Sequence, residues 1–400
     1  MKTAIQNRSL NFDDTSIAFA HQSNSKLRKT YLIFALMNQN WVVKIGTFFI
    51  KLAIKLGLPI KLLIKNTIFA QFCGGESIAT CQKTIESLAK SKIGTILDYS
   101  VEGEDNEKDF EATTNEVLKT IDRAAIQRED IPFSVFKVSG IGSVDLLEKV
   151  QEFPNTLSDT EKEAFDRLRN RVDKLCRHAA EQNVRIFLDA EESWIQDVID
   201  DLSYEMMRKY NVKDKTIVYN TFQLYRWESL EHLTTACDIA RQEGYKIGAK
   251  LVRGAYIEKE RRRAAELEYK DPIHAKKADT DTDFNKAIHF SIENLDVLSI
   301  CLGTHNEESC LLCADLMKDK GVAISDERIW FAQLLGMSDN ISFNLANAGY
   351  NVAKYVPYGP VEAVMPYLFR RAEENTSIAG QSSREFLLIK KERSRRKSNA

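Results

Sequence analysis

The segment Ile247-Gly-Ala-Lys-Leu-Val-Arg253 decides the fold, because it is a short apolar run that stops at a cation. Similar runs recur from Thr95 onward and alternate with longer stretches of helical patterning. This alternation indicates parallel βαβ units. The eight runs are TILD (95–98), FSVFK (133–137), VRIFLD (184–189), IVYNTFQ (217–223), IGAKLVR (247–253), LSICLGT (298–304), IWFAQ (329–333) and YNVAKYV (350–356).

Eight such units over about 280 residues predict an α/β fold, a (β/α)8 barrel of the TIM type rather than a doubly wound sheet. Residues 1–90 are predicted to form an N-terminal helical region with a break at Cys73-Gly74-Gly75. The barrel domain is assigned to residues 91–383. Residues 384–400 form a basic C-terminal tail, which we expect to be disordered or a frayed helix.

Composition is that of a globular protein and narrows the choice of partners. The 400 residues suffice for one large barrel and an extension, and the net charge of −2 gives no reason to expect nucleic acid. Seven dispersed cysteines suit reduced thiols in a cytosol-like compartment. Cys310 and Cys313 form one CxxC in an apolar helical run, so we expect two buried thiols and no metal site. With Asp13 and Asp14 near the polar start, we expect no secretory or transit peptide.

The run Trp41–Ile64 is apolar enough to suggest a membrane, but lysines interrupt it and Pro59 breaks it. Each lysine in the middle of a spanning helix costs about 2.5–3.5 kcal/mol, which argues against a span. Lys44, Lys51 and Lys55 recur on one helical face. Two interpretations stay open: a basic amphipathic helix in an anionic membrane interface, or a helix whose apolar face packs on the main domain.

The segment YLFRRAEE (367–374) predicts a helix with a reactive face. Tyr367, Arg370, Arg371 and Glu374 fall on one stripe, and Pro366 suits the first turn. Two adjacent guanidinium groups offer planar forks that grip a carboxylate or phosphate, and the glutamate can hold one of them in place. The alternative is a solvated charged face. The tyrosine and glutamate in register favour an anion-binding site.

Polar side chains close most of the predicted strands. They are Asp98, Lys137, Asp189, Gln223, Arg253, Thr304 and Gln333. In (β/α)8 barrels the active site lies at the carboxyl ends of the strands, so these side chains are candidates to line it. The alternative is that polar residues simply mark where strands stop. That explains any one residue better than it explains the mixture of cations, anions and amides.

The fifth strand end offers a surface for a flat group. Gly254 and Ala255 are small enough for such a group to approach the backbone. Arg253 supplies positive charge beside them, and Tyr256 supplies a ring on which to stack. The pattern predicts a binding surface at this strand end.

Three other strand ends add polar groups. Lys137 is a candidate second cation for an anionic substrate, and Asp189 puts a carboxylate at the rim. Thr304, His305 and Asn306 place hydroxyl, imidazole and amide groups after the sixth strand. A lone histidine is more often structural, but its position at a strand end favours contact with a cofactor.

Five segments form a set that is specific only in combination. They are FCGGE (72–76), LDAEE (188–192), LVRGAY (251–256), QLLGM (333–337) and YxxRRxxE (367–374). Together they resemble the monofunctional form of the FAD-dependent proline dehydrogenase family, over nearly the whole chain to about Asn375. KLVRGAY (250–256) is closer to the eukaryotic type. The resemblance implies a distorted (β/α)8 barrel whose last helix lies over the mouth.

The resemblance also implies a reaction. L-proline is oxidised to Δ1-pyrroline-5-carboxylate, the first step of proline catabolism, and a hydride passes to FAD. Electrons then pass to a quinone, which implies peripheral contact with a membrane and no nucleic acid partner. We expect a cytoplasmic location, with contact at the inner face of the inner membrane.

Site residues follow from the resemblance as two sets. The implied substrate-site residues are Lys137, Asp189, Tyr256, Leu334, Tyr355, Tyr367, Arg370, Arg371 and Glu374. Here the two arginines and Lys137 bind the carboxylate, Glu374 braces an arginine, and the tyrosines and the leucine enclose the ring. The implied flavin contacts are Gln223, Lys250, Val252, Arg253, Ala255, Thr304, His305 and Asn306. Lys250 stands where many relatives have arginine, which puts its contact with the flavin phosphates in doubt.

Three alternatives remain. The first is the same chemistry on trans-4-hydroxy-L-proline, although in the resembled family a tyrosine at the Tyr355 position crowds the carbon that carries the hydroxyl. The second is a flavin barrel with an unrelated anionic substrate. The third is a membrane-associated, non-catalytic scaffold that has lost the flavin, against which the intact polar rim argues.

Overall fold

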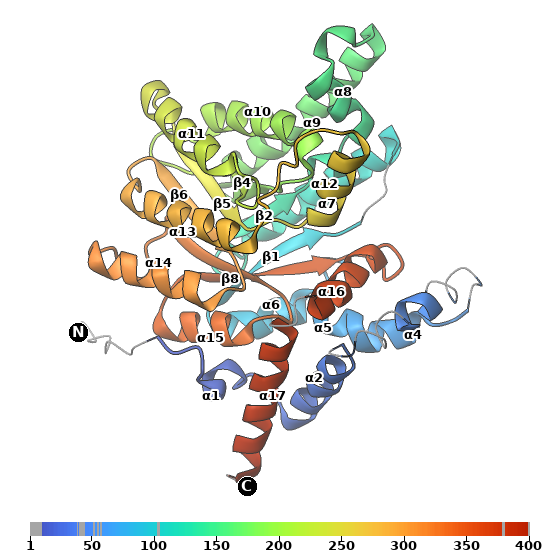
Figure 1. Cartoon of the computed structure of the whole chain (residues 1–400), viewed down its shortest axis with the longest axis vertical. Coiled ribbons are helices and arrows are strands. Elements are labelled where there is room, and N and C mark those ends of the chain that lie inside the picture. Colours follow the sequence, from blue (N-terminus) through green and yellow to red (C-terminus); the bar gives the residue numbers. More distant parts are fainter. Residues whose placement is uncertain are drawn as a thin grey trace.

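The chain folds into a barrel with a group of helices at one side (Figure 1). This computed structural model describes residues 10–37, 39, 45–50, 53, 56, 58–101, 105–377 and 381–398, and gives only the backbone for 373–377 and 381–383. Eight parallel strands close on themselves in sequence order. The strands are β1 Ile93–Tyr99, β2 Phe133–Phe136, β3 Arg185–Leu188, β4 Val218–Gln223, β5 Ile247–Val252, β6 Leu298–Gly303, β7 Ile329–Leu334 and β8 Val352–Tyr358.

The predicted α/β fold, a (β/α)8 barrel of the TIM type, is confirmed. Every predicted strand is present, and its ends agree with the sequence prediction to within two residues. β1 and β8 close the barrel through a register that runs from Ile93 beside Val352 to Tyr99 beside Tyr358. Apolar runs bounded by polar residues were sufficient here because strands covered by helices are buried on their outer face.

Helices that follow the strands in the chain cover the barrel. They are α7 Glu107–Ile126, α8 Val144–Glu152, α9 Asp159–Gln182, α10 Ser193–Tyr210, α11 Ser229–Glu243, α12 Ile257–Glu266, α13 Lys277–Glu293, α14 Glu307–Asp319, α15 Asp339–Ala348 and α16 Met365–Ser377. Helix α9 starts with a capping box between Ser158 and Glu161, and buries one stripe that includes Leu168 and Leu175. Cys310 and Cys313 are buried in α14, as predicted.

The barrel interior is layered from an apolar base to a polar mouth. Phe133 and Phe187 stack with their ring centroids 4.4 Å apart, and Tyr219 meets both edge-on. Because alternate residues of a strand point inward, the next inward positions along β2 and β3 fall at Val135 and then at Lys137 and Asp189. Strand alternation thus carries charged side chains to the carboxyl ends.

The N-terminal helices and the last helix form a second apolar core. They are α1 Thr15–Ala18, α2 Asn24–Met37, α4 Lys61–Ile64, a π-helix Lys65–Phe69, α5 Ala70–Phe72 and α17 Gln381–Ser398. Helix α6 Gln82–Ala89 instead buries Ile85 and Leu88 in the core of the barrel. In Figure 1, α17 runs beside α1 and α2 below the barrel. Phe34, Phe72 and Leu388 are buried in the second core together with Leu368 of α16. The extension therefore supports the helix that carries the arginine pair.

The predicted break after residue 72 is present. Helix α5 ends at Phe72, and Gly75 forms a parallel bridge with Tyr358 at the end of β8. A side chain at Gly74 would overlap Val356 of β8. The glycine pair thus lets this connection pass directly against the barrel.

The expectation that residues 384–400 are disordered or a frayed helix is wrong for the described residues to 398. The residue-384 boundary falls inside α17, in which Leu388 and Ile389 are buried. Glu392 is fully buried and accepts hydrogen bonds from Arg395 and Arg396, whose Nε atoms lie 2.7 Å from its carboxylate. The basic composition concealed a helix that is held by a buried acid and an apolar pair.

The segment at 41–64 is only partly described. Lys44, Lys51 and Lys55, on which the amphipathic prediction rests, lie outside the described residues. Phe48 and Phe49 are 63% and 60% exposed, and the α4 residues Leu62 and Leu63 are similarly exposed. Among the described helices, none combines the length and apolarity that a membrane span requires.

Candidate active site

Four predicted site residues meet at the carboxyl ends of the strands. The Lys250 ammonium donates to Asp189 Oδ1 and, over 2.6 Å, to the Tyr355 hydroxyl. That hydroxyl lies 3.3 Å from Asp189 Oδ1, and Lys137 Nζ lies 3.6 Å from Oδ2. Burial raises the pKa of Asp189, but the charges of Lys250 and Lys137 more than offset it, so the pKa falls below its ordinary value. Asp189 therefore stays ionised between two cations.

The two lysines differ in what they can reach. The Lys250 side chain is 6% exposed, and the ammonium also lies 4.7 Å from the centroid of the Tyr355 ring. The Lys137 side chain is 31% exposed. Lys250 is thus committed to the barrel interior, whereas Lys137 can contact a molecule in the mouth.

Asp98 is one of the strand-end candidates, but it is not among the site residues that the family resemblance implies. Burial raises its pKa, and the nearby charge of Lys137 opposes that rise. Ser100 donates a hydrogen bond to Asp98 Oδ2 over 2.8 Å. Its position near the end of β1, equivalent to those of Lys137 and Asp189, is the signal that marks it as a candidate.

Helix α16 brings the arginine pair to the mouth. Burial raises the pKa of the Tyr256 hydroxyl, and the charge of Arg370 opposes that rise, so Arg370 lies within electrostatic range of Tyr256. Arg371 lies over the Tyr367 ring, with its guanidinium carbon 5.2 Å from the centroid. Glu374 lies within α16, but the structure describes only its backbone.

The predicted aromatic and aliphatic wall comes from separate elements. Tyr355 and Tyr367 are 8% and 6% exposed, on β8 and α16. Leu334 ends β7 and contacts both the barrel interior and the second core. Tyr256 follows β5. These residues place apolar surface around the charged cluster.

Hydrogen bonds join the ends of β4, β5 and β6 into one edge. Gln223 accepts from the Ala255 N–H over 3.3 Å and donates to the Glu191 carbonyl over 2.6 Å. Arg253 donates to Asp281 over 2.7 Å and to Thr304 over 2.8 Å. The edge is therefore held rigid before any molecule binds.

Gly254 keeps this edge flat. Its φ of +135° is accessible to glycine and disfavoured for other residues. A side chain there would overlap the Tyr225 ring. The strand end thus needs a glycine beside Val252 and Ala255.

The loop after β6 presents polar groups at the same edge. Asn306 caps α14 by accepting from the Ser309 N–H over 2.8 Å, which leaves its amide nitrogen as a donor. His305 Nδ1 lies 2.8 Å from the Ser338 hydroxyl. Burial, with the charges of Lys354 and Arg371, lowers the pKa of His305 to about 3. The ring is therefore neutral, with one N–H and one lone pair.

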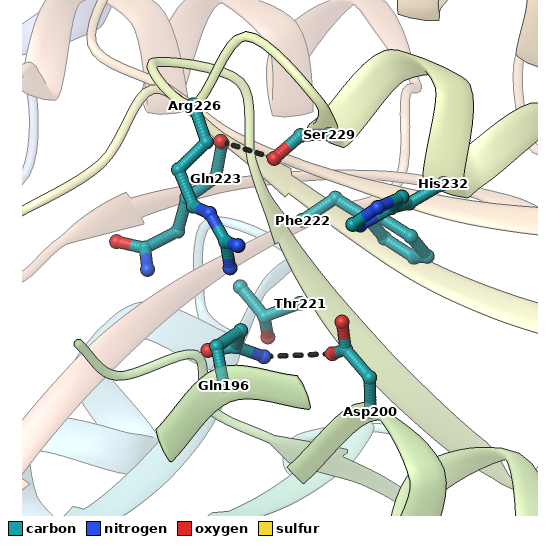
Figure 2. Close-up of a pocket in the computed structure, with 8 residues that line it drawn as sticks. All are labelled: Gln196, Asp200, Thr221, Phe222, Gln223, Arg226, Ser229 and His232. Atoms are coloured by element: carbon teal, nitrogen blue, oxygen red, sulfur yellow. Dashed lines mark hydrogen bonds between the residues drawn. The ribbon is translucent and has the colours of Figure 1, made fainter. Parts of the chain in front are cut away.

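A small polar cavity lies apart from this charged cluster, between β4 and helices α10 and α11 (Figure 2). Gln196 donates to Asp200 over 2.7 Å, and burial raises the pKa of Asp200 to about 6. Ser229 donates to the Gln223 carbonyl over 2.7 Å. The hydrogen-bonded side chains that line the cavity therefore help to fix the strand end at Gln223.

Within the described residues, no group of three or more His, Cys, Asp or Glu side chains is arranged to hold a metal ion.

Comparison with known proteins assigns the family. A sequence model described as Proline dehydrogenase matches residues 81–384. The chain belongs to the proline dehydrogenase family. Among members of the family, "Proline dehydrogenase 1, mitochondrial" of Dictyostelium discoideum is 32% identical, over 96% of this chain and 74% of that protein.

Other relatives differ in how much they share. "Carbapenem antibiotics biosynthesis protein CarD" of Pectobacterium carotovorum is 34% identical over 81% of this chain and 83% of that protein. Human "Proline dehydrogenase 1, mitochondrial" is 41% identical over 58% of this chain and 39% of that protein. A crystal structure of proline utilization A from Bdellovibrio bacteriovorus, inactivated by N-propargylglycine, has a TM-score of 0.71 at 19% identity. It covers 90% of this chain and 38% of that chain, and supports the proline dehydrogenase fold alone.

Proposed function

We propose that this chain oxidises L-proline to Δ1-pyrroline-5-carboxylate, with FAD as the hydride acceptor and a quinone as the next electron acceptor. This is the first step of proline catabolism. The observation that carries the proposal is the Lys137–Asp189–Lys250–Tyr355 cluster at the strand ends of a proline dehydrogenase family barrel. The arginine helix α16 beside it adds donors for a carboxylate.

The substrate site binds L-proline through its carboxylate. Arg370 and Arg371 provide planar donor forks, and Lys137 is the third cation because its side chain is 31% exposed, against 6% for Lys250. Binding through a group remote from the reacting carbon can serve orientation. The charged contacts thus fix the ring without blocking its C5 atom.

Tyr256, Leu334, Tyr355 and Tyr367 enclose the ring. The Tyr355 hydroxyl is pinned by Lys250 and Asp189, so its ring has little freedom to swing aside. A fixed tyrosine that crowds the substrate favours L-proline over its 4-hydroxy derivative. The apolar wall also excludes water from the reacting atoms.

The strand-end edge fits a flavin, because a flat ring can lie on the glycine-dependent surface at Gly254. The residues that would hold it are Gln223, Lys250, Val252, Arg253, Ala255, Thr304, His305 and Asn306. Arg253 and the neutral polar groups suit its phosphates, ribityl hydroxyls and ring edge. Lys250, whose ammonium is held by Asp189 and Tyr355, would meet the flavin only where the flavin lies beside that cluster. When bound, FAD supplies an acceptor for the hydride that leaves proline C5.

Membrane contact is supported by large apolar side chains that are exposed among the described residues between 32 and 63. Leu36, Phe48, Phe49, Leu62 and Leu63 are each at least 59% exposed. A concentration of large apolar side chains on a surface marks an interaction site, and a lipid-soluble quinone places that partner in a membrane. We infer a cytoplasmic enzyme bound peripherally at the inner face of the inner membrane.

An absorbance and bleaching assay tests the function. Purified protein should show flavin absorbance bands that L-proline bleaches under anaerobic conditions, and hydroxyproline should bleach them more slowly. A colourless protein that FAD cannot reconstitute would favour a non-catalytic scaffold. Faster bleaching by hydroxyproline would assign the chain to that substrate instead.

A further inference from the structure

The first turn of α17 closes over the loops that follow β6 and β7. Arg384 forms two hydrogen bonds of 2.9 Å to Glu307, at the start of α14. The next residue, Glu385, accepts a hydrogen bond from the Ser338 N–H. Glu385, Ser338 and His305 line one small cavity. The C-terminal helix thus reaches the predicted cofactor edge.

Ser338 is held in an unusual conformation between Glu385 and His305. Its φ of 49° and ψ of 43° are left-handed, which non-glycine residues seldom adopt. Its N–H points to Glu385, and its hydroxyl lies 2.8 Å from His305 Nδ1. Such a conformation persists where the surroundings over-determine it, so the serine is placed to link the two side chains.

We propose that Glu385 is a positioning residue for His305, and that it sets through the Ser338 hydroxyl which ring nitrogen carries the proton. The inference rests on the proposed function, in which His305 contacts the flavin. It adds Ser338 and Glu385, which lies in the C-terminal helix, to the residues that control this contact. The hydrogen bond at one nitrogen of a neutral histidine determines the tautomer and so the character of the other nitrogen.

Two arrangements of the same three side chains present different groups at His305 Nε2. When Glu385 is ionised, its charge favours the Ser338 O–H turned toward the carboxylate, so that the serine oxygen accepts from Nδ1–H and Nε2 carries the lone pair. When Glu385 is protonated, the Ser338 O–H can donate to Nδ1, and Nε2 then carries the proton. The cofactor edge therefore offers an acceptor in the first state and a donor in the second.

The charges around Glu385 place this change near neutral pH. Burial and the neighbouring Asp339 raise the pKa of Glu385 to about 7, against the opposing effects of Ser338 and Lys354. Lys354 of β8 lies 2.8 Å from Asp339, and the pKa of Asp339 is below its ordinary value because that lysine outweighs its burial.

The other groups packed around this cluster do not change their protonation state near neutral pH. His21, in the turn after α1, is neutral because burial lowers its pKa to about 4, and His305 is neutral for the same reason. The adjacent Arg384 keeps its charge, because its hydrogen bonds to Glu307 raise its pKa. Arg371 on α16 acts on His305 as a constant positive charge. Glu385 is therefore the member of this set that titrates.

The first test measures FAD affinity across neutral pH. Apoprotein is titrated with FAD and followed by quenching of flavin fluorescence. Wild type should show a change in Kd of about 2- to 10-fold centred near pH 7, the range expected for one hydrogen bond gained or lost. Glu385→Gln should remove this step, because its amide does not titrate. Ser338→Gly should also remove it, since glycine tolerates the left-handed backbone and lacks the hydroxyl.

Glu392→Gln is the matched control. It removes a buried carboxylate two turns later on the same helix, where the partners are Arg395 and Arg396 rather than the β7 loop. This variant should lose stability and keep the pH step. A step that persists unchanged in Glu385→Gln, or that disappears equally in Glu392→Gln, would overturn the inference.

A second readout needs no cofactor. In apoprotein labelled with 15N-histidine, the ring nitrogen shifts of His305 report the tautomer, and comparison with His305→Asn separates its signals from those of the other five histidines. The proton should move from Nδ1 to Nε2 as pH falls through about 7 in wild type and not in Glu385→Gln. An unchanged tautomer in wild type would refute the relay. Failure of wild type to bind FAD would instead refute the proposed function.

Discussion

Replacing Lys250 by methionine should destabilise the barrel by leaving a buried carboxylate with one distant cation. Lys250 and Asp189 are 6% and 13% exposed, and the ammonium donates directly to the carboxylate. Breaking a buried pair by removing one partner costs about 3–5 kcal/mol. Because Lys137 remains 3.6 Å from Asp189, we expect a loss of about 3 kcal/mol, at the lower end of this range.

The loss of stability in Lys250→Met should depend on pH, and the pKa of Asp189 determines whether it grows or shrinks as pH rises. In the wild type the pKa of Asp189 is below its ordinary value, so its contribution to stability is present above the unfolded-state pKa. That contribution is lost only as pH falls through the lowered folded-state pKa. In Lys250→Met the effect of burial prevails and raises the pKa, so stability is lost as pH rises from the unfolded-state pKa to the folded one. The deficit of the variant should therefore be larger at about pH 7 than at about pH 5.

Urea unfolding of wild type and variants at these two pH values is the assay. Lys250→Met/Asp189→Asn should be more stable than Lys250→Met alone by about 1–2 kcal/mol, because the buried charge is gone. Lys246→Met is the control: its partner Asp214 is 92% exposed, so the loss should be less than about 1 kcal/mol. A deficit that does not change with pH, together with no recovery in the double variant, would refute the reasoning.

Three further outcomes are expected. Arg370→Met or Arg371→Met should raise the KM for proline steeply and retain flavin, since loss of a buried charged contact costs about 2–5 kcal/mol; a KM within about twofold of wild type for both would contradict the carboxylate assignment. Tyr355→Ser should shift the kcat/KM ratio toward hydroxyproline by at most about 100-fold, and an unchanged ratio would remove Tyr355 from the ring-binding wall. Phe48→Ser/Phe49→Ser should weaken co-sedimentation with liposomes and slow quinone reduction while sparing activity with a soluble dye, and equal sedimentation would count against membrane contact through these residues.

The strands were predictable because their signal is local. A run such as IGAKLVR (247–253) is apolar, short and closed by a cation, and burial beneath helices makes that pattern sufficient to identify a strand. The ends of strands then predicted Lys137 and Asp189, since parallel strands bring their carboxyl ends together. The sequence thus predicted each residue at the rim, whereas the 3.6 Å contact between them is seen only in the folded structure.

Lys354 shows what local patterns miss. It lies inside β8, 1% exposed, and pairs with Asp339 fifteen residues before it in the chain. A lysine within a strand usually indicates an exposed face, and no local feature distinguishes one that is buried by a distant acid. The partner of a buried charge is a tertiary property, so this cluster appears only once the strands and helices are assembled.

The same limit explains the C-terminal helix and its role. Residues near Arg384 look like a solvated basic tail, because their anchors lie far away in the chain: Glu307 is 77 residues earlier, and Asp13 is 371 residues earlier. Arg396 adds contacts to the Phe19 and Gln22 carbonyls, each 2.8 Å long. Helix α17 is thus hydrogen-bonded to residues 13–22 beneath the barrel, and its first turn contacts the loops after β6 and β7. Because α16 and α17 adjoin in sequence, a change that breaks these hydrogen bonds should disturb the arginine pair and the cofactor edge together.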